Sequence, residues 1–144
     1  ANKKGIQFVW YAPTPVCLFN PIAHGLGAKS CACCDGLLSV DAEGGLLPCS
    51  SFSEPVGNLL QEGFEKVWYN RASKFWRAKD FAPIGCKECE HFAYCYGACP
   101  LYWDVHGYDE IKEFWPKKNR VQERLDEARL ALSRRIRGDQ HGIT

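Results

Sequence analysis

Cysteine side chains carry the most distinctive chemistry in this sequence. The chain has 144 residues and nine cysteines, and residues 86–99 contain four of them with the spacing C-x2-C-x5-C-x3-C. Thiolate sulfur is a soft donor, so four thiolates this close in sequence favour zinc or an iron–sulfur cluster. Zinc sites commonly combine two C-x2–4-C knuckles, whereas ferredoxin-like sequences divide neighbouring cysteines between two clusters. The short spacer between the two pairs is explained more naturally by such a division.

A disulfide framework explains the cysteines less well. Such frameworks occur in secreted chains with an even number of cysteines, whereas the count here is odd and residues 1–16 show no export-signal pattern. Metal ligation requires reduced thiols. We therefore expect a cytoplasmic, reducing or anaerobic location.

Composition and charge limit the partners. Hydrophobic residues make up 46% of the chain and charged residues 24%, which is typical of a globular domain. A net charge of +1 argues against steering toward nucleic acid or an anionic membrane. No apolar run is long enough to span a membrane. We therefore expect neither a nucleic-acid nor a membrane partner.

The elements around the cysteines are predicted to be short. Residues 37–49 have two apolar runs around Asp-Ala-Glu-Gly-Gly, which predicts a β-hairpin with cysteines near both ends. Asn58 is a suitable N-cap for a following helix, and the apolar residues between Leu59 and Trp68 fall at helical spacing on one face. Residues 6–11 are a candidate strand without an obvious partner. Beyond Pro116 the pattern predicts an amphipathic helix with Gly138 as its stop. The expected fold class is a small, loop-rich α+β domain with a hairpin, helices and a C-terminal helix. The apolar stripe of that last helix comprises Val121, Leu125, Ala128, Leu132 and Ile136.

The order of cysteines and glycine extends the pattern upstream. Cys34 is followed by nine residues and Gly44, then by four residues and Cys49, and later by the four-cysteine segment. This string resembles the SPASM motif of radical SAM maturases, C-x9–15-G-x4-C…C-x2-C-x5-C-x3-C…C. The resemblance covers roughly residues 17–103 and includes the hairpin and the helix after it. A single C-x2-C is a weak signal, but the whole concatenation is specific.

The resemblance implies two auxiliary 4Fe–4S clusters. By position, Cys34, Cys49 and Cys99 would ligate the proximal cluster, and Cys86, Cys89 and Cys95 the distal one. Full cysteine ligation of two clusters needs eight thiolates, whereas the family's final cysteine has no counterpart after Cys99. The upstream cysteines Cys31 and Cys17 could complete the set, with Cys31 at the proximal cluster and Cys33 left over. Alternatively, the distal cluster has an open iron or a ligand such as Asp104 or His106.

The resemblance also implies a role beside a catalytic domain. The radical SAM core requires a C-x3-C-x2-C loop, which this sequence lacks, so the chain is not expected to be catalytic alone, and S-adenosylmethionine would bind only to the parent or partner. We expect a C-terminal domain or a separate subunit of a radical SAM enzyme that modifies a peptide or protein substrate or matures a cofactor. Its work would be electron transfer and substrate positioning. The expected organisation is the end of a barrel or an N-terminal strand over 1–16, the auxiliary cluster domain over 17–115, and the helix and tail over 116–144.

The alternative from another class is a zinc-binding structural or interaction module. One zinc would explain the four cysteines of residues 86–99 but would leave the hairpin cysteines unexplained. The four histidines are scattered, and a surface or hydrogen-bonding role is the simpler interpretation for each. The aromatic side chains near the cysteines are interpreted first as packing. These histidines are His24, His91, His106 and His141.

Overall fold

The computed structural model describes residues 2–114 and 120–136. The chain forms two compact units, and each is formed by segments that are distant in sequence. The first unit consists of Ala1–Cys31 and Ala82–Asn119, and the second of Ala32–Phe81 and Arg120–Thr144. Within the described residues, no helix has the length and apolar character needed to cross a lipid bilayer.

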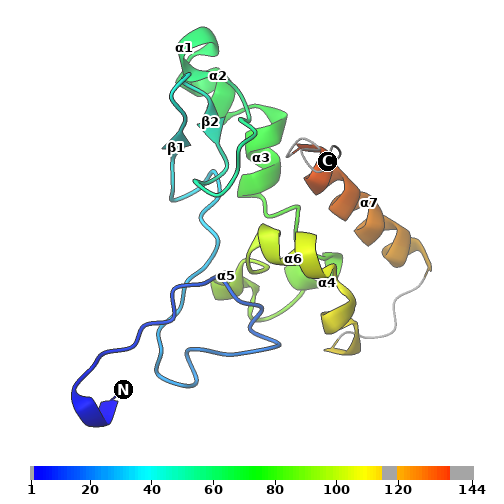
Figure 1. Cartoon of the computed structure of the whole chain (residues 1–144). Coiled ribbons are helices and arrows are strands. Elements are labelled where there is room, and N and C mark those ends of the chain that lie inside the picture. Colours follow the sequence, from blue (N-terminus) through cyan, green and yellow to red (C-terminus); the bar gives the residue numbers. More distant parts are fainter. Residues whose placement is uncertain (1, 115–119, 137–144) are drawn as a thin grey trace, which may run out of the picture. The chain divides into compact units, whose positions relative to one another are not determined.

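The predicted α+β class is confirmed. One two-stranded antiparallel sheet is joined to several short helices and long loops (Figure 1). In the second unit, β1 (Ser39–Val40) pairs with β2 (Leu46–Leu47), with Ser39 opposite Leu47 and Val40 opposite Leu46. The hairpin therefore lies within the predicted range of residues 37–49.

The hairpin turn is built by one carboxylate and one glycine. Asp41 Oδ1 accepts hydrogen bonds from the backbone N–H groups of Glu43 and Gly45, at 3.0 and 2.6 Å. Gly44 has φ +84°, and a Cβ there would lie 2.5 Å from Cγ of Leu60. A side chain at Gly44 would thus meet both backbone strain and a clash. The turn residues fold the chain back within a few positions, as the sequence predicted.

Three short helices follow the hairpin. They are α1 (Leu59–Glu62), α2 (Phe64–Trp68) and α3 (Arg71–Arg77). Asn58 is the N-cap of α1, as predicted, and accepts from the N–H groups of Leu60 and Gln61. The predicted single helix is interrupted at Gly63, whose φ of +81° is outside the helical region.

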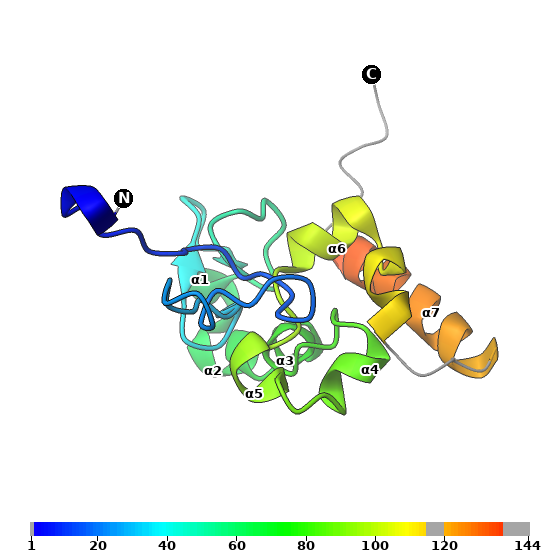
Figure 2. The ribbon, with the colours of Figure 1, turned by 90° about the horizontal axis from the view of Figure 1, so that it is seen from below.

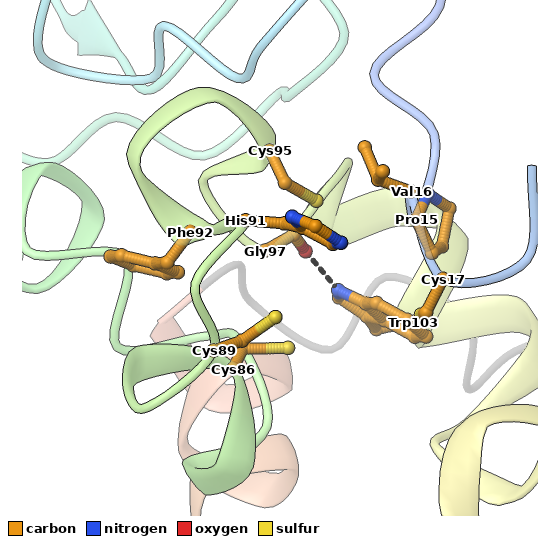
Figure 3. Close-up of a pocket in the computed structure, with 10 residues that line it drawn as sticks. All are labelled: Pro15, Val16, Cys17, Cys86, Cys89, His91, Phe92, Cys95, Gly97 and Trp103. Carbon is orange, nitrogen blue, oxygen red and sulfur yellow. Dashed lines mark hydrogen bonds between the residues drawn. The ribbon is translucent and has the colours of Figure 1, made fainter. Parts of the chain in front are cut away.

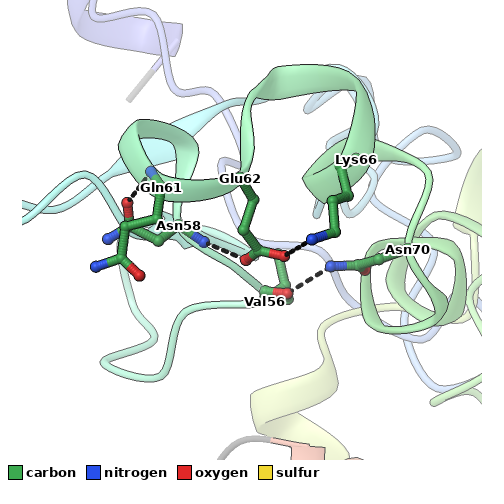
Figure 4. A network of polar contacts seen from close by, with 6 residues as sticks. All are labelled: Val56, Asn58, Gln61, Glu62, Lys66 and Asn70. Carbon is green, nitrogen blue, oxygen red and sulfur yellow. Dashed lines mark hydrogen bonds and ion pairs between the residues drawn. The ribbon is translucent and has the colours of Figure 1, made fainter.

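Polar side chains connect these helices to the preceding loop (Figure 4). Glu62 accepts from the N–H of Asn58 at 3.1 Å and pairs with Lys66 at 3.5 Å. Asn70 caps α3 by accepting from Ser73 N, and its amide donates to Val56 O at 2.7 Å. Glu62 and Asn70 each satisfy a backbone group that a helix end or loop would otherwise leave without a partner.

The core of the second unit surrounds Trp76 on α3. Its ring is fully buried and lies 4.9 Å from the ring of Phe52 and 5.7 Å from that of Phe81, between ring centroids. Val67 is also fully buried. By contrast, Leu60 and Phe64 are exposed, so only part of the predicted apolar face of residues 59–68 enters the core.

The first unit contains the remaining short helices. They are a 3-10 helix at Asn2–Lys4, α4 (Ile84–Lys87), α5 (Phe92–Cys95), α6 (Pro100–His106) and a 3-10 helix at Asp109–Phe114. Figure 2 shows α4 and α5 from a second side. The strand expected over 6–11 is not formed, because no described segment pairs with it as a ladder; its Trp10 N–H donates to Leu26 O at 2.8 Å.

The predicted C-terminal helix is present as α7 (Arg120–Ile136). Three members of its expected apolar stripe, Val121, Leu125 and Leu132, are exposed by 64%, 48% and 37%. The predicted stop at Gly138 lies outside the described residues.

Candidate metal centre

Four cysteine side chains of the first unit line one cavity (Figure 3). Cys17 comes from the N-terminal segment, Cys86 and Cys89 from α4 and the turn after it, and Cys95 from the end of α5. The cavity holds about 380 Å³ of space between atoms, including a part open to solvent. Its lining is mainly apolar apart from the thiols. The other lining residues are Pro15, Val16, His91, Phe92, Gly97 and Trp103.

Successive turns bring Cys86 and Cys89 to the same wall. The N–H of Cys86 donates to Pro83 O at 2.9 Å, and the N–H of Cys89 donates to Cys86 O at 3.1 Å. A spacing of three residues in such turns places the two side chains on one side. Figure 3 shows both sulfur atoms directed into the cavity next to each other. The C-x2-C spacing therefore has a direct local explanation.

Cys95 and Cys17 approach from the other side of the cavity. The N–H groups of Leu18 and Phe19 both donate to Pro15 O, which folds the segment that carries Cys17 into a turn. The Cys95 thiol donates to Thr14 O at 3.8 Å, and this contact holds α5 to the same segment. Long-range contacts thus bring Cys17 to the C-x2-C-x5-C part of the motif.

A left-handed stretch of backbone separates Cys95 from Cys99. Tyr96, Gly97 and Ala98 have φ values of +49°, +71° and +64°. This conformation costs about 1–2 kcal/mol for each residue other than glycine. The indole N–H of buried Trp103 stabilises the stretch by donating to Gly97 O at 2.5 Å. Cys99 follows this reversal and is not among the residues that line the cavity.

The thiols around the cavity influence one another electrostatically. Burial raises the pKa of the Cys17 thiol, and negative charge on Cys95 and Cys89 raises it further. Several thiolates facing one space repel each other unless a cation lies between them. A positively charged metal core would remove that repulsion, and thiolates are the ligands that soft metals prefer.

The donor set therefore fits an iron–sulfur cluster: four thiols line the cavity beside one imidazole, and apolar side chains fill most of the remaining wall. No group of three or more His, Cys, Asp or Glu side chains within the described residues is arranged to hold a single metal ion.

His91 lines the cavity, although the sequence analysis favoured a surface or hydrogen-bonding role for it. It is half-buried, and its Nε2 lies 3.7 Å from a carboxylate oxygen of Glu90. No sequence pattern distinguished His91 from the other histidines. His106, the alternative ligand considered above, instead pairs with Glu110 at 3.4 Å, and neither it nor Asp104 lines the cavity.

The second unit holds another group of cysteines. Cys33 and Cys34 are buried before the hairpin, and Cys49 follows it. The N–H of Cys34 donates to Pro48 O at 3.2 Å, which holds the two ends of the hairpin together. A hydrogen bond from Cys33 is the main cause that lowers the pKa of Cys49 to about 6, and the N–H of Ser51 adds to it. Cys31, the last residue of the N-terminal segment of the first unit, is also buried.

Two cationic side chains, at the end of α3 and just after it, donate hydrogen bonds to the backbone carbonyl groups of the adjacent residues Cys33 and Cys34. Arg77 Nη1 donates to Cys34 O at 3.2 Å, and its Nη2 donates to Trp68 O at 2.6 Å. Lys79 is 2% exposed, and its Nζ lies 3.4 Å from Cys33 O and 3.3 Å from a carboxylate oxygen of Asp35. A lysine is rarely buried so completely without a specific partner.

A comparison with protein families supplies an independent line of evidence. Residues 31–90 match the model of SPASM, an iron–sulfur cluster-binding domain. The match includes the hairpin and the first two cysteines of the C-x2-C-x5-C-x3-C segment. Neither the search of curated proteins nor that of solved structures found a match. The match confirms the predicted resemblance of residues 31–90 to SPASM, which is an iron–sulfur cluster-binding domain.

Proposed function

We propose that this chain binds two 4Fe–4S clusters and acts as the auxiliary electron-transfer and substrate-positioning domain, or subunit, of a radical SAM enzyme. Bound clusters would supply one-electron redox chemistry at potentials set by their ligands, hydrogen bonds and burial. The observation that carries the proposal is the cavity lined by Cys17, Cys86, Cys89 and Cys95.

The cavity would hold the distal cluster. Its four thiols satisfy full cysteine ligation, so neither Asp104 nor His106 is needed there. Cys17 thereby takes the place of the fourth ligand that the motif leaves undefined. The second, proximal cluster would be ligated by Cys49 and by a cysteine that precedes the hairpin, as the motif implies.

The chain's own residues would tune the distal cluster. Trp103, Phe92, Pro15 and Val16 would give the cluster a mainly apolar wall, and the His91 ring could donate a hydrogen bond at its edge. A buried site with few polar groups favours the less charged oxidation state of a cluster.

The test is anaerobic purification followed by reconstitution with iron and sulfide. The loaded protein should be brown, absorb broadly near 400 nm and contain about eight irons per chain, as two 4Fe–4S clusters require. Dithionite reduction should give two distinguishable EPR signals, and Cys89→Ala should retain about half of the iron. Colourless protein with stoichiometric zinc would overturn the proposal and favour the structural zinc module.

The radical SAM partnership needs a separate experiment. Anaerobic co-purification of the tagged chain from its native cells should enrich a protein with a C-x3-C-x2-C loop, or reveal that loop in a longer form of the same chain. The modified target should be a peptide or protein, detected as a mass change that requires S-adenosylmethionine. Loaded protein that supports no such reaction with the co-purified enzyme would contradict this role while leaving cluster binding intact.

A further inference from the structure

We propose that Cys33, rather than its neighbour Cys34, ligates the cluster expected at Cys49, and that Lys79 is the positioning residue that presents it. This inference rests on the proposed function. It concerns a choice that the motif leaves open, because ten residues separate Cys33 from Gly44 and nine separate Cys34 from it. Both spacings fall within the C-x9–15-G range.

The first argument is the contact between the two thiols. The side chain of Cys33 hydrogen-bonds to Cys49 across the base of the hairpin. Cys33 is a bridge residue, whereas Cys34, at φ +47°, begins a left-handed turn, so the two backbones have different conformations. The pair that faces across the hairpin base therefore contains Cys33.

The second argument is the backbone that fixes this orientation. Cys33 forms an isolated bridge with Leu37, and the N–H of Asp35 donates to Ala32 O at 3.1 Å, so residues 33–37 form a closed turn. The N–H of Cys34 is bonded to Pro48 O at 3.2 Å. These bonds hold the turn beside Cys49.

The third argument is the role of Lys79. Its ammonium group is bonded to Cys33 O and paired with Asp35, on either side of Cys34 in the sequence. Lys79 itself has φ +57°, a conformation that costs free energy for a residue other than glycine. A buried positive charge beside the Cys33 backbone would favour the more negative, reduced state of a nearby cluster.

The primary test compares Cys33→Ala with its matched control, Cys34→Ala, in the full chain. Both substitutions remove one buried thiol and reduce the side-chain volume by the same amount. After anaerobic reconstitution, Cys33→Ala should lose up to half of the iron and one of the two EPR signals, while Cys34→Ala should resemble the wild type. The reverse pattern, or equal loss from both variants, would overturn the choice of Cys33.

A second measurement needs no cluster. Mild oxidation of the apoprotein with glutathione disulfide, followed by peptide mass spectrometry, should give a Cys33–Cys49 disulfide in preference to Cys34–Cys49. Preferential Cys34–Cys49 pairing would overturn the contact on which the inference rests. Wild type without iron would refute the proposed function, whereas loaded wild type with a fully loaded Cys33→Ala variant would refute only this assignment.

Lys79 is tested by Lys79→Met with Lys79→Arg as the conservative variant. Lys79→Met should retain the wild-type iron content but lower the midpoint potential of one EPR signal, and Lys79→Arg should restore it at least in part. A potential that is the same in all three proteins would refute the positioning role.

Discussion

The thiol of Cys95 donates a hydrogen bond to the carbonyl oxygen of Thr14, 81 positions earlier in the chain. This contact joins the cysteine-rich segment to the stretch that carries Cys17. It explains how a thiol far outside the C-x2-C-x5-C-x3-C pattern comes to line the same cavity.

Cys17→Ser should therefore impair the cavity cluster selectively. A serine oxygen is a poorer ligand than a thiolate for an iron–sulfur cluster, so one EPR signal should be lost or altered while the other is unchanged. Val16→Ala is the matched control, because Val16 lines the same cavity without offering a donor. A Cys17→Ser protein with the iron content and spectrum of the wild type would show that Cys17 is not a ligand.

Local turn chemistry explains which parts of the fold could be predicted. Asp41 and Gly44 define the hairpin, and Asn58 defines the start of α1, through contacts within a few residues. The interruption at Gly63 was missed because glycine is tolerated within many helices, and only the backbone conformation reveals the break. The candidate strand at residues 6–11 has no partner strand in the described part of the chain. Its apolar pattern alone was therefore insufficient to predict a strand.

The candidate site was only partly predictable for a similar reason. The turn that directs Cys86 and Cys89 is local, so the C-x2-C spacing alone predicts that their two thiols lie on the same side. The placement of Cys17 and His91 in the same cavity depends on tertiary contacts that leave no periodic signal. The sequence analysis left Cys33 over after eight ligands were counted, and the contact of Cys33 with Cys49 leaves no signal in the sequence.

Gly97→Ala should destabilise the first unit strongly. Gly97 has φ +71°, and a Cβ at this position would clash with Cβ of Ala82. The strain alone costs about 1–2 kcal/mol, and the clash with a buried neighbour adds to it. We expect a loss of about 2–4 kcal/mol in the free energy of unfolding, measured by urea denaturation of the apoprotein.

Gly25→Ala provides the control for backbone strain. Gly25 also has a positive φ, +66°, but a Cβ there would meet no atom within 4 Å. This substitution should cost about 1 kcal/mol. Equal destabilisation by the two substitutions would indicate that the contact with Ala82 does not matter.

Lys79→Met should weaken the second unit as well as alter its proposed cluster. The substitution removes a hydrogen bond to Cys33 O and the ion pair with Asp35. Asp35 is partly exposed and can be solvated after the change, so we expect a loss of about 1–2 kcal/mol rather than the full cost of an unpaired buried charge. Lys74→Met on the exposed side of α3 is the control and should be nearly neutral. Urea denaturation that finds no difference between these variants would contradict a structural role for the Lys79 ammonium group.

Cys49 should be the thiol that shows the clearest pH dependence in the apoprotein. Its pKa is lowered from 9.0 to about 6, chiefly by the hydrogen bond from Cys33. Since the thiolate is the reactive form, its alkylation by iodoacetamide should approach its maximum above pH 7 and fall as the pH decreases through about 6. Cys17, whose pKa is raised by burial and by the charge of Cys95, should react more slowly at pH 7 in the same sample.

Cys33→Ala tests the cause of that shift. Without the main hydrogen bond, the pKa of Cys49 should rise, and the midpoint of its alkylation profile should move to higher pH. The folded-state pKa lies below the unfolded value, so this hydrogen bond stabilises the apoprotein fully above about pH 9, and its contribution is lost as the pH falls toward 6. Peptide mass spectrometry resolves the rate at each cysteine. An unchanged Cys49 profile in Cys33→Ala would mean that Ser51 and the local backbone, rather than the neighbouring thiol, hold the Cys49 thiolate.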